Sequence, residues 1–139
     1  LEVQIFGRIP LAISARCYHA RQCGLHKDGC QYVCAEDPDG LTVETLDGED
    51  FLAVNGTQTL THTIGALMPE LEELRGMGIE NFRLWPQAID MVAVAQIFRD
   101  VLEGRMETQE AWQSLADIAG FAPFSNGFYH GEEGVSLKR

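Results

Sequence analysis

The chain has 139 residues, of which 45% are hydrophobic and 22% are charged, and it carries a formal net charge of −11 at pH 7. This length and composition predict one globular domain, residues 1–139, with a core of its own. The acidic balance argues against a nucleic-acid-binding protein, because such proteins usually present a basic face. No run of apolar residues reaches the roughly 18 that a membrane-spanning helix needs, and the first residues lack the basic leader of a signal peptide. We therefore expect a cytoplasmic protein.

The first part of the chain predicts short strands around a long irregular segment. Residues 1–6 alternate apolar and polar side chains, which is the period of a strand with one buried face. Residues 11–13 predict either a second short strand or an apolar turn of helix. The segment 15–40 holds every cysteine, has no periodicity, and predicts a loop with at most one helical turn. Residues 41–54 predict a β-hairpin that turns at an Asp-Gly pair.

The middle of the chain predicts an α/β unit. A helix is expected to begin after Thr61 or Thr63, where apolar residues recur at helical spacing, and to end at Gly76. Residues 79–85 predict a strand, and the apolar periodicity of 87–103 predicts a helix opened by the preceding proline. The order helix, glycine, strand, helix is typical of a parallel strand covered by helices.

The last part of the chain predicts one more helix and an irregular end. Thr108 is expected to cap a helix that carries Trp112 towards the core. Residues 120–139 are rich in glycine and aromatic side chains and predict irregular surface. No shift in composition marks a domain boundary, although the hairpin could be an insertion. The expected fold class is therefore α/β, with parallel strands, outer helices and a hairpin after a cysteine-rich loop.

All the thiols of the chain are gathered in one short stretch. The four cysteines are Cys17, Cys23, Cys30 and Cys34, with five, six and three residues between neighbours. Soft ligands concentrated in this way indicate an iron–sulfur cluster or zinc, while disulfides and unbound thiols are the alternatives. Zinc ribbons favour two-residue gaps and ferredoxin-type runs are also tighter, so the spacing alone does not identify the metal.

The cysteine segment is also the least acidic part of the chain. Residues 1–34 carry four basic and two acidic side chains and sum to +2, so the remainder of the −11 total sums to −13. The charged residues of 1–34 are Glu2, Arg8, Arg16, Arg21, Lys27 and Asp28. Nearby cations favour a thiolate over a thiol, which suits a metal site. The alternative is that the arginines fall there by chance.

Histidines and an arginine accompany the cysteines. His19 and His26 lie inside the segment, where each could ligate a metal or donate a hydrogen bond to a cluster sulfur, or simply face solvent. Arg16 precedes the first cysteine. A guanidinium pairs bidentately with carboxylates, so Arg16 is a candidate for binding a carboxylate substrate or for offsetting cluster charge. An ordinary surface ion pair is the alternative.

One resemblance covers essentially all of the chain. The stretch from Phe6 to Cys17, followed by Cys30 and Cys34, resembles the second half of the collagenase-like, unknown-mechanism peptidase family. The most specific part is the cysteine pattern, with twelve residues between the first two of these cysteines and three before the third. The likeness continues to the ending 126–131, and it spans only part of a full-length relative.

The resemblance implies both a fold and a cofactor. It implies the C-terminal half of a (β/α) barrel-like scaffold. It also implies a [4Fe–4S] cluster held by four cysteines, three of which match Cys17, Cys30 and Cys34, with the fourth in an N-terminal half. Cys23 has no counterpart, so it either substitutes as a fourth ligand in this fragment or is a bystander. In the fragment alone the cluster could be absent, or zinc could replace it.

The resemblance further implies a function. Relatives take part in the oxygen-independent hydroxylation of the ring of a ubiquinone precursor, as a heterodimer with a sister protein and with prephenate as a hypothetical oxygen donor. His130 lies in the recurring ending and is a candidate for substrate binding. Two alternatives stay open: a non-catalytic interaction module stapled by zinc or disulfides, and a peptidase. The sequence argues against proteolysis, because it has neither a His-Glu-x-x-His nor a Gly-x-Ser-x-Gly motif.

Overall fold

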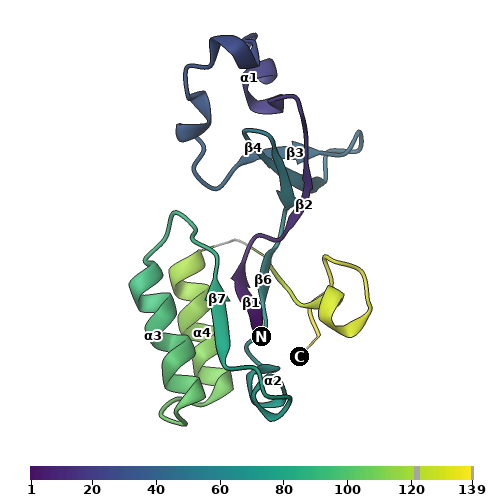
Figure 1. Ribbon diagram of the computed structural model, residues 1–139. Helices are drawn as coiled ribbons and strands as arrows, with labels where there is room; N and C mark the ends of the chain where they lie inside the picture. The colour runs from purple at the N-terminus through teal and green to yellow at the C-terminus, as the bar shows by residue number, and fades with distance from the viewer. Residues whose placement is uncertain (121–122, 139) are drawn as a thin grey trace. The chain divides into compact units, whose positions relative to one another are not determined.

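The computed structural model describes residues 1–120 and 123–138, apart from the side chain of Lys27. The chain divides into two compact units (Figure 1). Unit 1 consists of Leu1–Gly7 and Ile64–Arg139, and unit 2 of Arg8–Thr63. Unit 2 therefore lies between two parts of unit 1 in the sequence, and it contains both the cysteine segment and the predicted hairpin. The prediction of a mixed α/β chain is confirmed.

Unit 1 contains a four-stranded mixed sheet. Its strands, in the order β7-β1-β6-β8, are β7 (Asn81–Leu84), β1 (Glu2–Gly7), β6 (Ile64–Ala66) and β8 (Phe124–Ser125). β1 pairs parallel with β7 and antiparallel with β6, and β6 pairs parallel with β8. The predicted strands at 1–6 and 79–85 are therefore confirmed, and they are parallel neighbours.

The core of unit 1 lies between this sheet and its helices. The helices are α2 (Leu71–Gly76), α3 (Met91–Leu102) and α4 (Thr108–Ala119), and a 3-10 turn, η3 (Gly127–His130), follows near the end. α3 and α4 lie side by side (Figure 1). Phe6 is fully buried and meets Phe98 edge to face, with ring centroids 5.8 Å apart. Trp112 packs against the core, as predicted.

Three boundaries in unit 1 differ from the predictions. α3 begins at Met91 rather than 87, because the Asp90 carboxylate caps it by accepting bonds from two backbone amides. Thr108 is the first helical residue of α4 and not its cap. The tail was predicted to be irregular surface, but it forms β8 and η3, and Asn126 is buried. Residues 121, 122 and 139 of that tail lie outside the described residues.

Unit 2 contains a four-stranded antiparallel sheet. Its strands, in the order β2-β5-β4-β3, are β2 (Pro10–Ile13), β5 (Gln58–Thr61), β4 (Asp50–Asn55) and β3 (Leu41–Glu44). The predicted hairpin is confirmed as β3 and β4, and residues 11–13 form a strand. The helix predicted to begin after Thr61 or Thr63 is confirmed only in its second part, as α2 with its end at Gly76, because the strand β6 occupies its beginning. The residues just before it, 57–63, alternate threonines and include β5, and β-branched residues favour strands.

The strand directions in the two sheets do not match the parallel barrel that the resemblance implies. One sheet is mixed and the other is antiparallel, so the sheets of the described chain are not a parallel barrel. The parallel pair β1 and β7 is the part of the predicted parallel-strand unit that is present. Within residues 1–120 and 123–138, no helix is both long enough and apolar enough to cross a membrane.

Candidate functional site

The cysteine segment contains a short helix that begins and ends at a cysteine. Helix α1 (Tyr18–Gln22) has Cys17 at its N-cap and Cys23 at its C-cap. The Cys17 sulfur accepts a hydrogen bond from the Ala20 backbone amide at 3.3 Å. A cap sulfur in this role replaces the hydroxyl or carboxylate that usually satisfies the first amides of a helix. Within the loop predicted at 15–40, the one α-helical turn is therefore capped by the first cysteine.

The second half of the segment consists of two 3-10 turns, η1 (Lys27–Gly29) and η2 (Val33–Ala35). The Cys30 sulfur accepts a hydrogen bond from the Tyr32 backbone amide at 3.4 Å. Tyr32 has a φ of 56°, which is a strained conformation for a residue with a side chain. Cys34 follows inside η2 and is partly buried. Backbone N–H donors to sulfur are a common feature around metal-binding thiolates.

A buried histidine ties the two halves of the segment together. His19 on α1 is 1% exposed, and its Nε2 lies 3.0 Å from the Asp37 carboxylate beyond η2. α1 and η2 lie beside each other. The other ring nitrogen, Nδ1, is buried and has no hydrogen-bond partner among the described residues. His19 is therefore buried inside unit 2, and a solvent-facing role does not describe it.

The four cysteines are not disulfide-bonded, and their sulfurs are not gathered around one metal position. Cys17 and Cys34 are partly buried, whereas Cys23 and Cys30 are exposed. Among the described residues, no three side chains of histidine, cysteine, aspartate or glutamate converge on one metal position. The donor set suits an iron–sulfur cluster chemically, because thiolates are its usual ligands and two of these sulfurs accept backbone N–H bonds. Holding a cluster would require the segment to close around it.

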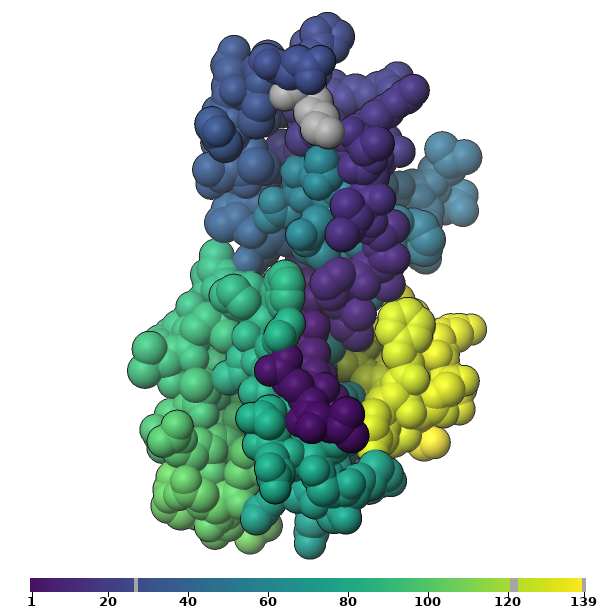
Figure 2. Space-filling view, viewed as in Figure 1, coloured from purple at the N-terminus to yellow at the C-terminus, as the bar shows by residue number. Residues whose placement is uncertain are grey.

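An open pocket of about 680 Å³ adjoins the first cysteine. Its wall includes the side chains or backbone of Ala15, Arg16, Cys17, Arg21, Gly24, Leu25, His26 and Asp28. Figure 2 shows this part of the chain, in purple and dark blue, at the surface. Arg16, His26 and Cys17 were candidates from the sequence, and the structure places all three in the lining of this one pocket. Arg21 also lines the pocket, although the sequence did not single it out as a site residue.

A partly buried arginine in unit 2 has a structural role. The Arg8 guanidinium donates to the backbone carbonyls of Thr61 and His62. Burial lowers the pKa of Arg8, and the carboxylates of Asp39 and Asp50 act in the opposite direction. These contacts join the end of β5 to the segment just before β2, so the Arg8 side chain has a structural role.

His130 in unit 1 is bound to a buried carboxylate that the sequence did not single out. The Glu70 side chain is 4% exposed, and its Oε1 lies 2.8 Å from His130 Nε2. The same oxygen accepts a 2.8 Å hydrogen bond from Asn126 Nδ2, while Oε2 is buried without a partner. Burial, followed by a hydrogen bond to Glu73, raises the pKa of the neighbouring Tyr129. Glu70 follows Pro69 in a predicted helix, where a glutamate carries no distinguishing signal.

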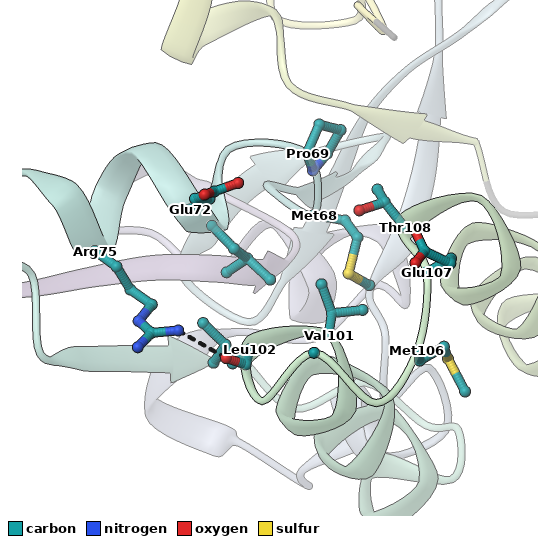
Figure 3. Close-up of a pocket in the computed structure, with 11 residues that line it drawn as sticks. Met68, Pro69, Glu72, Arg75, Val101, Leu102, Met106, Glu107 and Thr108 are labelled. Carbon is teal, nitrogen blue, oxygen red and sulfur yellow. Dashed lines mark hydrogen bonds between the residues drawn. The ribbon is translucent and has the colours of Figure 1, made fainter.

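A second pocket lies within unit 1, with a volume of about 350 Å³ (Figure 3). Met68, Val101 and Thr108 line it together with Arg75. The Arg75 guanidinium donates a 2.7 Å hydrogen bond to the carbonyl of Leu102, the last residue of α3, and this contact stabilises the end of that helix. The pocket also has Glu72 and Glu107 in its lining, but among the described residues no group of three metal ligands forms there, and it contains no thiol, so the cysteine segment is the better candidate site.

No protein-family model matches the chain, and no solved structure matches it.

Proposed function

We propose that this chain is the C-terminal portion of an iron–sulfur protein of the collagenase-like peptidase family. In this proposal Cys17, Cys30 and Cys34 hold three corners of a [4Fe–4S] cluster, and the fourth ligand comes from outside the chain. The protein resembles in particular the ubiquinone biosynthesis protein UbiV. It acts with a UbiU-like partner in the oxygen-independent hydroxylation of a quinone precursor, with prephenate as oxygen donor. The finer fold proposal is half of a (β/α) barrel, to which the parallel pair β1 and β7 would contribute.

The observation that carries the proposal is the local order around the three cysteines. Two of the sulfurs accept backbone N–H bonds, from Ala20 and from Tyr32. Such donors favour the thiolate, which is the form that binds iron. When bound, a cluster of this kind supplies one-electron redox chemistry. The residues of the chain supply the ligands, the N–H donors to sulfur and the positive charge of the neighbouring arginines.

Cys23 is proposed to be a bystander in the full-length protein. It closes α1 at its C-cap and is exposed. It also has no counterpart in the family pattern, whereas the other three cysteines keep the family spacing. Its nearness to them makes it a natural matched control for the ligands.

The two alternatives receive less support. A disulfide-stapled module would need paired cysteines, and all four are free here. A peptidase with a cysteine nucleophile would need a histidine hydrogen-bonded to the thiol, but among the described residues the two cysteine sulfurs that accept hydrogen bonds accept them from backbone amides. A zinc-stapled module shares its ligands with the cluster, so only the identity of the metal separates the two.

The test is the metal and sulfide content of the full-length protein, prepared without oxygen together with its partner. We expect about four iron and four sulfide per protein and a broad visible absorption band. Replacing Cys17, Cys30 or Cys34 by serine should each abolish most of the iron. Cys23→Ser, the matched control, should keep it.

Two outcomes would overturn the proposal. One equivalent of zinc and no sulfide would establish the stapled module instead. Full iron retention in all three serine variants would remove these cysteines from the site altogether.

A further inference from the structure

The pocket beside Cys17 carries positive charge that the protein itself does not neutralise. Within the part of the chain that the structure describes, neither Arg16 nor Arg21 forms an ion pair or a side-chain hydrogen bond, although the chain has a net charge of −11. By contrast, Arg83 pairs with Glu2, and Arg105 with two carboxylates. Two arginines line one pocket, with Asp28 as the one acidic residue in the described lining, so this part of the surface has a local excess of positive charge.

The fold brings these groups to one pocket through the geometry of α1. The Arg21 amide donates to the Cys17 carbonyl at 3.1 Å, which places these two residues one turn apart on the same face. Gly24, with a φ of +69°, then reverses the chain. The Leu25 amide donates to the Ala20 carbonyl at 2.8 Å, and this turn directs Leu25 and His26 back to the pocket.

We propose that this pocket binds a carboxylate group of a small organic molecule, held by Arg16 and Arg21 next to Cys17. A guanidinium presents parallel N–H donors that match the two oxygens of a carboxylate. The lining also includes the apolar residues Ala15 and Leu25, which suit the carbon skeleton of an organic acid better than inorganic phosphate. The volume of about 680 Å³ is within the usual range of roughly 300–1,000 Å³ for small-molecule sites.

This inference deepens the proposed function and rests on it for its biological meaning, because it names a ligand class for the same site. A carboxylate held here would lie beside one of the three proposed cluster ligands. The pocket itself is present without any metal, so binding of an anion can be measured on the chain as it is.

The test is a titration of the 139-residue chain with malonate at constant ionic strength. We expect malonate to slow the alkylation of Cys17 by iodoacetamide at least fivefold at saturation, while the rate at the exposed Cys23 stays unchanged. The Gly24 amide signal in an NMR spectrum should shift with the same concentration dependence. Arg16→Gln and Arg21→Gln should each weaken malonate binding by about tenfold, as the loss of one charge-assisted pair requires.

Arg99→Gln is the matched control, because Arg99 is an exposed arginine on α3 in unit 1. It should leave malonate binding unchanged, and unshifted amide signals elsewhere would show that the pocket variants fold. Protection that tracks ionic strength alone would overturn the inference, and so would protection by phosphate without protection by malonate. If malonate binds but the full-length protein retains no iron, the proposed function is wrong, while the proposal that this pocket binds a carboxylate is supported.

Discussion

At the scale of single residues, the Glu70 carboxyl group shows how a buried polar side chain can organise the end of a chain. It lies just before α2, accepts a hydrogen bond from Asn126, and forms a second hydrogen bond with His130 at the end of η3. Asn126 in turn exchanges hydrogen bonds with the backbone of Lys138 on both sides. One buried oxygen therefore connects the start of α2 with the segment 126–130, which is far away in the sequence, and Asn126 extends the connection to Lys138.

Removing this carboxyl group should destabilise unit 1. Glu70→Ala leaves the buried Asn126 amide and the His130 ring without their shared acceptor, so we expect the free energy of unfolding to fall by about 3 kcal/mol. Glu72→Ala is the control, because Glu72 is exposed on the same helix and should change stability by less than about 0.5 kcal/mol. Urea denaturation measures both values. Equal losses in the two variants would show that the buried contacts contribute nothing specific.

At the scale of elements, the connection between α3 and α4 is held by one aspartate. Asp100 Oδ1 accepts hydrogen bonds from Gln96 and from Arg105, at 2.9 and 2.8 Å. Its backbone carbonyl also accepts the amides of Arg105 and Met106, and Gly104 supplies the left-handed turn with a φ of +69°. The hydrogen bonds from Arg105 lower the pKa of Asp100.

The lowered pKa of Asp100 predicts the direction in which stability changes with pH. A carboxylate whose folded pKa lies below its unfolded value stabilises the fold above the unfolded pKa, and the contribution is lost as the pH falls through the folded pKa. Asp100→Asn should therefore lower the melting temperature at pH 7, and the difference from the parent protein should shrink as the pH falls below the ordinary value of 3.8. Asp117→Asn is the control, since Asp117 accepts only from the neutral amide of Gln113. A difference that is the same at pH 7 and pH 2.5 would contradict the assignment.

Prediction from the sequence succeeded where a pattern is local and failed where distant segments choose the structure. The alternation in 1–6 and the Asp-Gly turn of the hairpin are local, and both are present in β1 and in β3–β4. The apolar residues from Ile64 onward suit a helix, but Ile64–Ala66 form β6, which pairs with β1 at the other end of unit 1's sequence. That pairing depends on a strand elsewhere in the chain, so propensity alone could not decide it.

The candidate site was predictable to a similar degree. The cysteines and Arg16 could be recognised by residue type and spacing. The pairing of His19 with Asp37, and that of His130 with Glu70, joins residues whose proximity only the fold creates. The ligand geometry of the cysteines could not be predicted, because a loop of this length takes its final form from what it binds.

At the scale of the whole molecule, the apolar core is divided unequally. The core cluster lies in unit 1 and includes large, fully buried side chains such as Phe6, Met68 and Leu115. The buried apolar residues of unit 2 are Ala20, Ala53, Val54 and Leu60. Small side chains bury little area, so unit 2 gains less stability from the hydrophobic effect than unit 1 does.

Hydrogen exchange should therefore distinguish the two units. Local opening free energies follow the buried apolar contacts of each region, so in the metal-free chain we expect amides of β4 in unit 2 to exchange about tenfold faster than amides of β1 and α3 in unit 1. Because metal binding contributes directly to folding free energy, anaerobic iron and sulfide loading of the full-length protein should slow exchange in the cysteine segment. The amides of α3 serve as the internal control and should keep their rate. Uniform protection across both units without metal would refute this division of stability, because it would mean that the small core of unit 2 is as strong as the large one.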